Sequence, residues 1–295
     1  MAVEKPQYNI VYACDNNFAP LLAASIKSVE INSPGSIKNI YIIDDGIKPE
    51  NVEKIKQSFT SPEIILHFHL VKDVMGKNVN IPYFNNPRLP VTTFFRLFIA
   101  SFMPADTEKV LYLDSDMIVL GDLKELFDLD LSNHIIGAVQ DPNIVTLGCS
   151  WGGGVQNWEA LGYQSDDPYF NAGLLLINFK KWVEFDVTSK ALEAAAKYQR
   201  YIKWGDQYCL NVVLANRWLH LDPEWNHLVD NNNPGGKLIH YIGNKPIYDN
   251  YPYSKAYQDI FFSYLNQTLL KDHKPVTKLQ RQIQMVKRFI RKITG

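Results

Sequence analysis

Cysteines and long apolar runs are both scarce in this sequence. Its three cysteines, Cys14, Cys149 and Cys209, are far apart and show no CxxC spacing, so we expect neither a disulfide framework nor a structural zinc site. No run approaches the roughly 20 apolar residues of a membrane span, and the polar residues 1–7 lack the apolar core of a signal peptide. These absences predict a protein of the reducing cytoplasm.

The sequence also lacks an excess of either charge. Its 30 basic and 31 acidic residues give a formal charge of −1, which argues against a nucleic-acid partner held by phosphate contacts. Any basic surface must therefore be local. A chain of 295 residues, 46% of them hydrophobic, can bury a large core without cross-links.

Glycine is missing where a common nucleotide-binding loop would need it. The first predicted strand ends in Ala13, Cys14, Asp15, Asn16 and Asn17, so neither a dinucleotide fingerprint nor a Walker loop is present. Phosphate must be bound in another way. Asp15 and Asn17 could hydrogen-bond a base or a ribose at the edge of a sheet, could cap the following helix, or could do both.

Strand and helix patterns alternate along the chain. We expect strands at 9–13, 40–43, 64–70, 110–113, 117–120, 173–178 and 238–241, and helices at 19–32, 49–59, 188–201 and 206–215. This βαβ rhythm predicts an α/β fold with a mainly parallel sheet.

Two irregular stretches interrupt this rhythm. The polar residues 71–90 are too many for an ordinary connection, and such loops are usually functional or disordered. The second stretch, 141–169, contains Trp151, three glycines from Gly152 to Gly154, Trp158 and Tyr163. It suits either a mobile sugar-binding lid or a packed surface loop.

A pair of carboxylates follows the apolar strand KVLYL. Asp114 and Asp116 flank Ser115 at its end, where ligands of open α/β sheets usually bind. The pair could hold one divalent ion, or it could be an acidic turn. His240 could supply a third ligand, or it could be a hydrogen-bonded core residue. Carboxylates with one imidazole suit Mn²⁺ better than Mg²⁺.

Several sequence blocks, taken together and in order, resemble a known family. They are NIVYACDNNFAPLLAASIKSV, LPVTTFFRL, KVLYLDSDMIVLGDL, YFNAGLLLINFKKW, GDQYCLN and HYIGNKP. This order resembles family 8 of the retaining glycosyltransferases, which includes bacterial lipooligosaccharide galactosyltransferases and glycogenin. The resemblance implies a GT-A type, Rossmann-like single domain with a mixed, mainly parallel sheet and a helical C-terminal tail.

The resemblance also implies a role for each matched position. The implied metal ligands are Asp114, Asp116 and His240; the uridine site is Ala13, Asp15 and Asn17, with Ser115 beside the ribose; the donor-sugar pocket is Arg96, Asn171, Ala172, Asp206 and Gln207; and the diphosphate clamp is Gly243 and Lys245. Among these, Arg96, Asp206 and Gln207 are the expected catalytic residues.

From the residues alone, other roles remain open. Arg96 could pair with a surface acid, Asn171 could cap a strand end, and Asp206 could be a helix N-cap. The chain also departs from the family pattern after the histidine, because Gly243 is followed by Asn244-Lys245-Pro246-Ile247. One residue of the usual spacing and the usual tryptophan are missing.

The implied reaction moves glucose or galactose from UDP-glucose or UDP-galactose to a glycan, glycolipid or glycoprotein acceptor with Mn²⁺, or with Mg²⁺ as the alternative metal. Gln207 is the residue best placed beneath the sugar, and its neutral amide is a poor nucleophile, which favours a front-side substitution. One alternative is a sugar-nucleotide nucleotidyltransferase, although its glycine-rich activating loop is absent. Another is a catalytically silent sugar-binding scaffold.

The residues from 277 onward differ in composition from the rest. We divide the chain into a catalytic domain at 1–250 and a C-terminal helical region at 251–295. In its tail, apolar residues recur at spacings of four and three, namely Leu279, Ile283, Val286, Ile290 and Ile293. The basic residues between them are Lys278, Arg281, Lys287, Arg288, Arg291 and Lys292. Such a helix suits the anionic inner face of the cell membrane, or it could dock on the catalytic domain or on another subunit.

Overall fold

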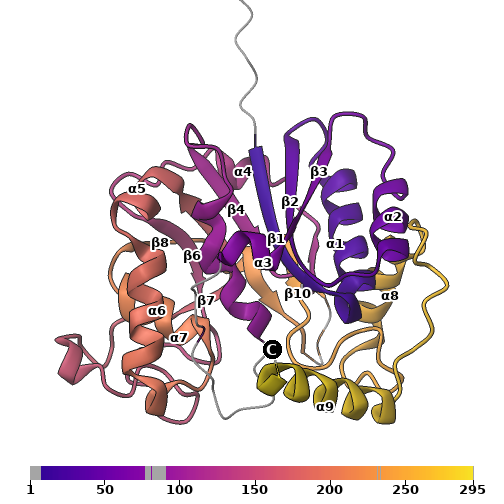
Figure 1. Cartoon of the computed structure of the whole chain (residues 1–295). Helices are drawn as coiled ribbons and strands as arrows, with labels where there is room; N and C mark the ends of the chain where they lie inside the picture. The colour runs from indigo at the N-terminus through magenta and orange to yellow at the C-terminus, as the bar shows by residue number, and fades with distance from the viewer. Residues whose placement is uncertain (1–7, 77–80, 82–90, 231, 233, 295) are drawn as a thin grey trace, which may run out of the picture.

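The structure, a computed structural model, describes residues 8–76, 81, 91–230, 232 and 234–294. A seven-stranded sheet crosses the middle of the molecule in the order β3-β2-β1-β4-β7-β6-β8 (Figure 1). Its strands are β1 (Tyr8–Asp15), β2 (Ile37–Asp45), β3 (Ile65–Leu70), β4 (Lys109–Leu113), β6 (Ile136–Gln140), β7 (Phe170–Asn178) and β8 (Trp218–His220).

Strand direction brings several chain segments to one edge of this sheet. β1 is parallel to β2 and β4, β2 to β3, and β6 to β8, whereas β7 is antiparallel to both of its neighbours. The expected mainly parallel sheet is therefore confirmed. Because β7 runs the other way, its first residues lie beside the carboxyl end of β4, where Asp114 N donates to Gly173 O at 2.8 Å.

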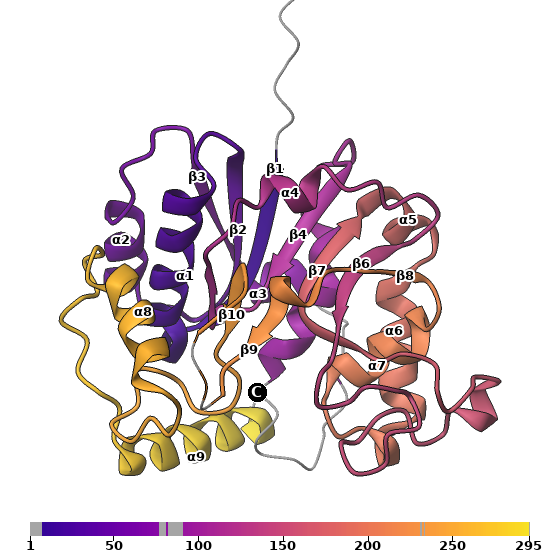
Figure 2. The same ribbon diagram turned by 180° about the vertical axis from the view of Figure 1, so that it is seen from behind.

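Helices cover both faces of the sheet. Ile10 and Tyr12 of β1 pack into one hydrophobic cluster, and Val11 and Ala13 pack into the other, since side chains alternate along a strand. The first cluster includes α1 (Ala19–Asn32), α2 (Pro49–Gln57) and α8 (Lys255–Leu265). The second includes α3 (Val71–Met75), the 3₁₀ helix η2 (Val91–Ser101), α5 (Phe179–Glu184), α6 (Val187–Lys197) and α7 (Asp206–Leu214). Figures 1 and 2 show α1, α2 and α8 at the β3 side and α5 to α7 at the β8 side.

A second, small sheet positions the histidine. It consists of β5 (Met117–Val119), β10 (Leu238–His240) and β9 (His227–Leu228), in the order β5-β10-β9. β10 is antiparallel to β5 with His240 opposite Met117, and Tyr241 N donates to Asp116 O at 2.9 Å. This pairing brings His240 to the Asp116 segment, although the two are far apart in the sequence.

Most expected elements lie where the periodicity placed them. The helix at 19–32 has the expected bounds, and strands are found at all seven expected places. The expected helix at 188–201 ends at Lys197, because Tyr198 leaves helical geometry, and a separate 3₁₀ turn, η4 (Gln199–Tyr201), follows. The patterns missed η2, β6, β8 and α5, whereas α8 falls inside the helical region expected at 251–295. The remaining short elements are η1 (Asn16–Phe18), α4 (Lys124–Phe127), η3 (Glu159–Leu161) and η5 (Pro223–Asn226).

The structure describes only part of the first irregular stretch and all of the second. The polar stretch 71–90 begins with α3, and its residues 77–80 and 82–90 lie outside the described residues, as do residues 1–7. In the stretch 141–169, an added Cβ at Gly154 would stand 2.4 Å from Leu147 O, and one at Gly152 would stand 2.9 Å from Asn143 O. Close packing therefore accounts for these two glycines and favours a packed loop.

The last helix, α9 (Lys278–Thr294), lies along the lower edge of the molecule near α8 (Figure 1). Its side chains Leu279, Ile283 and Val286 are 66%, 45% and 57% exposed, so these three apolar residues lie at the surface of the part of the chain that the structure describes. Among the helices that the structure describes, none is long and apolar enough to cross a membrane.

Candidate active site

The predicted site residues gather at the carboxyl edge of the large sheet. Ala13 and Asp15 end β1, Asp114 to Asp116 follow β4, and Asn171 and Ala172 begin the antiparallel β7. The other elements that reach this edge contribute Asn17 on η1, Arg96 on η2, Asp206 and Gln207 on α7, His240 at the end of β10, and Gly243 and Lys245 just after it.

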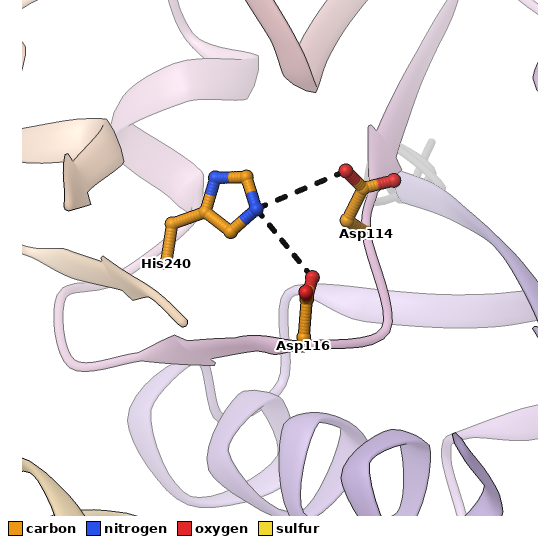
Figure 3. A group of neighbouring side chains, drawn as sticks. All are labelled: Asp114, Asp116 and His240. Atoms are coloured by element: carbon orange, nitrogen blue, oxygen red, sulfur yellow. Dashed lines mark ion pairs between the residues drawn. The ribbon is translucent and has the colours of Figure 1, made fainter. Parts of the chain in front are cut away.

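Asp114, Asp116 and His240 converge on one point (Figure 3). Each offers a ligand atom, and these atoms lie within 4.8 Å of one another. His240 Nε2 is 3.9 Å from Asp114 Oδ2 and 3.5 Å from Asp116 Oδ1. All three side chains are buried or partly buried. The structure thus brings together the three metal ligands expected from the sequence.

Each carboxylate is anchored through its other oxygen. Asp114 Oδ1 accepts hydrogen bonds from Arg96 Nη2 and Tyr112 Oη, both at 3.0 Å. Asp116 Oδ2 contacts the Lys245 ammonium. Burial raises the pKa of the Asp116 carboxyl, but Lys245 and His240 outweigh burial and hold that pKa below its ordinary value. Asp114 Oδ2 and Asp116 Oδ1 are therefore left facing the imidazole.

A chain of buried amides orients that imidazole. Asp141 Oδ2 accepts from Asn171 Nδ2 at 2.9 Å, so Asn171 Oδ1 is left to accept from Asn226 Nδ2 and Gly173 N, also at 2.9 Å. Asn226 Oδ1 then lies 3.0 Å from His240 Nδ1. Because this oxygen can only accept, Nδ1 carries a proton and Nε2 is the ring nitrogen available to a metal.

The packing around His240 also explains Gly173. An added Cβ at Gly173 would stand 2.5 Å from His240 Cε1 and 2.6 Å from Met117 Cε. No real Cβ tolerates such contacts, so any other residue would displace the imidazole or the strand. The glycine therefore allows β7 and β10 to approach closely.

Arg96 joins the metal candidates to the predicted sugar pocket. Its Nε lies 2.7 Å from Asp206 Oδ2, its Nη2 contacts Asp114, and its Nη1 donates to Ala172 O. Burial opposes the charge on Arg96, yet Asp114 and Asp206 raise its pKa above the ordinary value. Burial raises the pKa of Asp206 to about 6, and Arg96 counters part of that rise. Arg96 is thus paired with two acids of the site, the partly buried Asp114 and the buried Asp206.

Gln207 is held at both ends of its amide. Its Oε1 accepts from Ala172 N at 3.0 Å, and its Nε2 donates to Asp141 Oδ2 at 3.2 Å. Asp141 is itself fixed, because its Oδ1 accepts from Asn143 N and Ile144 N. One buried carboxylate therefore orients both Gln207 and, through two asparagines, His240.

The sequence can be compared with known families once this geometry is in view. It matches the family described as Glycosyl transferase family 8 over residues 9–247. The chain belongs to glycosyl transferase family 8. The order of the sequence blocks predicted this family.

Similar proteins of this family come from several bacteria. Glycosyltransferase GlyF of Streptococcus pneumoniae is 28% identical in an alignment 276 residues long that covers 86% of this chain and 62% of that protein. Lipopolysaccharide 1,3-galactosyltransferase of Salmonella typhimurium is 27% identical over 227 residues, 75% of this chain and 63% of that protein. The chain thus spans less than two thirds of the length of each.

A solved structure of the galactosyltransferase LgtC, in complex with donor and acceptor sugar analogues, superposes with a TM-score of 0.72. It is 26% identical, and the match covers 88% of this chain and 96% of LgtC. Together with the mixed sheet, this likeness shows the GT-A type fold.

The structure tests the capping roles that the sequence left open for Asp15 and Asp206 of this family 8 chain. Asp15 caps η1, because its Oδ1 accepts from Asn17 N at 2.9 Å and from Phe18 N at 3.2 Å. The Asn17 amide donates to Asp15 Oδ2 at 3.3 Å. Asp206 is not the N-cap of α7, a position held by Gly205. The buried ion pair with Arg96 is its structural role instead.

The shorter spacing after His240 still brings Lys245 to the site. Its ammonium contacts Asp116 and donates to Tyr241 O at 2.7 Å. Gly243 has a φ of 63°, a left-handed conformation that suits glycine, so the chain can turn sharply between the strand and the lysine. Ser115 is buried between the two metal candidates.

Sequence reasoning missed Asp141, Asn226 and Tyr112. Asp141 was noted only as the start of an irregular stretch, and nothing around Asn226 marks it as special.

The aromatic residues of the stretch 141–169 divide into two kinds. Trp158 and Tyr163 pack against the core, whereas Trp151 is 78% exposed.

Proposed function

We propose that this chain is a retaining, metal-dependent hexosyltransferase that moves glucose or galactose from UDP-glucose or UDP-galactose to a glycan, glycolipid or glycoprotein acceptor. The observation that carries the proposal is the convergence of Asp114 Oδ2, Asp116 Oδ1 and His240 Nε2 at the ligand edge of the sheet. Three lone-pair atoms so close together favour a cation between them.

The donor set fits Mn²⁺, with Mg²⁺ as the second choice, since it combines carboxylate oxygens with one imidazole nitrogen. The hydrogen bond from Nδ1 to Asn226 leaves the correct nitrogen available. A divalent ion held there would neutralise charge on the departing diphosphate.

Different residues of the chain would bind the uridine, the diphosphate and the sugar of the donor. Ala13, Asp15 and Asn17 would bind uridine, with Ser115 beside the ribose, and Gly243 and Lys245 would contact the diphosphate. Arg96, Asn171, Ala172, Asp206 and Gln207 would line the sugar pocket. The shared position of these residues at one sheet edge supports this division.

The proposed chemistry is a front-side substitution. The acceptor oxygen bonds to the anomeric carbon as the bond from that carbon to the phosphate oxygen breaks, and the hydroxyl proton passes to the leaving phosphate. Gln207 supports rather than attacks, because its amide is neutral and already hydrogen-bonded at both ends. A glycosyl adduct trapped on Gln207 and seen by mass spectrometry would contradict this mechanism.

We also propose a catalytic domain at 1–250 and a helical region at 251–295, with α9 on the anionic inner face of the membrane and the catalytic domain in the cytoplasm. The exposure of Leu279, Ile283 and Val286 supports this placement, as does the surplus of basic residues in the tail.

The test is release of free UDP from a panel of UDP-sugars and ADP-glucose, with Mn²⁺ or with a chelator. We expect release from UDP-glucose or UDP-galactose that requires Mn²⁺ and rises with a suitable glycan acceptor. A silent sugar-binding scaffold would release no UDP. A nucleotidyltransferase would instead form pyrophosphate from a nucleoside triphosphate and a sugar phosphate.

A further inference from the structure

The first turn of α9 contacts the loop that carries the predicted diphosphate clamp. Thr277 Oγ1 accepts from Gln280 N at 3.2 Å, and Gln280 Oε1 accepts from Thr277 N at 2.8 Å. This reciprocal pair is a capping box, which fixes where the helix begins. Arg281 is the next residue, and its side chain is only 18% exposed.

Arg281 spans the loop that follows β10. Its Nη1 donates to Asn244 Oδ1 at 3.3 Å, and its Nη2 donates to Asn250 Oδ1 at 2.6 Å. Its guanidinium carbon stands 4.6 Å from the centre of the Tyr248 ring. The nearest carboxylate, Asp249, is 4.0 Å away and 40% exposed. Hydrogen bonds and stacking therefore hold this arginine, rather than one strong ion pair.

The contacts continue from the loop to the metal candidates. Asn244 is the neighbour of Lys245, and Tyr248 N donates to Lys245 O at 2.9 Å. Lys245 in turn contacts Asp116. Just before α9, Val276 N donates a hydrogen bond to Ile247 O, and Val276 O accepts one from Asp249 N.

We propose that Arg281 is a positioning residue for the diphosphate clamp, so that the first turn of α9 is a working part of the donor site. The inference rests on the proposed role of Gly243 and Lys245 toward the donor diphosphate. It also distinguishes Arg281 from Lys278 and Lys287, which are exposed, because the Arg281 guanidinium contacts the loop after β10.

Holding the loop in this way needs the planar, forked guanidinium group of arginine. Two separate nitrogens of the guanidinium hold two asparagines at opposite ends of the loop, which one ammonium on a flexible stem cannot reproduce. Without the fork, the loop must be ordered by the donor itself, and that entropic cost weakens donor binding more than it slows the bound complex.

The test compares Arg281→Ala, Arg281→Lys, Asn250→Ala and the double variant Arg281→Ala/Asn250→Ala with the wild type. The matched control is Gln282→Ala, an exposed change on the same turn. For Arg281→Ala we expect the donor KM to rise about five- to tenfold with kcat within about twofold. We expect Arg281→Lys to restore little of the lost donor affinity. The double variant should have no higher donor KM than Arg281→Ala, since Arg281→Ala and Asn250→Ala both break the same hydrogen bond.

Hydrogen exchange without ligand gives an independent readout. Amides of residues 242–250 should exchange faster in Arg281→Ala and unchanged in Gln282→Ala. Unchanged exchange in Arg281→Ala, or an equal rise in the control, would overturn the inference. If the exchange differs as expected but the wild type releases no UDP from any donor, the proposed function fails while the loop contact stands. If the wild type is active and Arg281→Ala keeps its donor KM, the positioning role is wrong.

Discussion

Asn226 decides which nitrogen of His240 faces the carboxylates. Its oxygen accepts the Nδ1 proton, and its amide nitrogen is committed to Asn171. A metal-binding histidine usually depends on such a partner for its orientation and its tautomer. Asn226 and Asn171 would therefore be part of the proposed metal site, although neither would touch the metal.

We predict that Asn226→Ala weakens Mn²⁺ binding about 10- to 100-fold, because the imidazole loses the acceptor that fixes its tautomer. Isothermal titration with Mn²⁺ in the presence of UDP measures the change. Asn133→Ala, at an exposed position, is the control and should bind Mn²⁺ as the wild type does. An unchanged dissociation constant for Asn226→Ala would mean that the amide chain does not orient His240.

Single residues differ in how well the sequence predicts them. Asp114, Asp116 and Lys245 belong to local motifs, and all three lie at the candidate site although the spacing after His240 is shorter than usual. Asp141 and Asn226 act through hydrogen bonds between segments that only the folded sheets bring together. No local pattern in the sequence encodes those contacts.

At the scale of elements, α9 contacts the loop after β10 on one side and is exposed on another. Arg281 and the preceding Val276 contact the loop after β10, while Leu279, Ile283 and Val286 are exposed. The tail was expected either to bind a membrane or to dock on the catalytic domain. Its first turn does dock, and the membrane role stays a prediction for the rest.

We predict that a chain ending after Gln284 no longer sediments with anionic liposomes. This cut removes Lys287, Arg288, Arg291 and Lys292, whose attraction to an anionic surface is at most about 1 kcal/mol per residue and weakens with salt. It leaves Val276 and Arg281 in place, so the donor KM should not change. Full-length protein that ignores such liposomes at low salt, or a shortened chain that binds them equally, would contradict the membrane role.

Helices and strands with a regular pattern of apolar residues are the easiest to predict from the sequence. The long helix at 19–32 and the strands at the seven expected places show clear patterns and were found. The eleven-residue 3₁₀ helix η2 was missed, since 3₁₀ helices of that length are uncommon. The small sheet was also missed as a unit, because β5, β9 and β10 have at most three residues each and acquire meaning only by pairing.

For the whole molecule, the sequence predicted the fold class well because a parallel sheet needs buried strands and intervening helices in alternation. The same topology explains the site. Strand ends that meet at one edge bring the nucleotide, metal and sugar candidates together without any glycine-rich loop. We therefore propose that UDP binding at this edge requires a metal held by Asp114, Asp116 and His240.

The most direct test of that claim is thermal unfolding with UDP and Mn²⁺, singly and together, for the wild type, Asp116→Asn and the exposed control Asp166→Asn. Ligand at about 100 times its dissociation constant stabilises the native state by about 2.7 kcal/mol, which corresponds to a rise in Tm of roughly 5 °C or more. We predict this rise for the wild type and the control only when UDP and Mn²⁺ are both present, none for Asp116→Asn, and a smaller one with ADP. Equal stabilisation by UDP without Mn²⁺, or an undiminished rise in Asp116→Asn, would contradict the account.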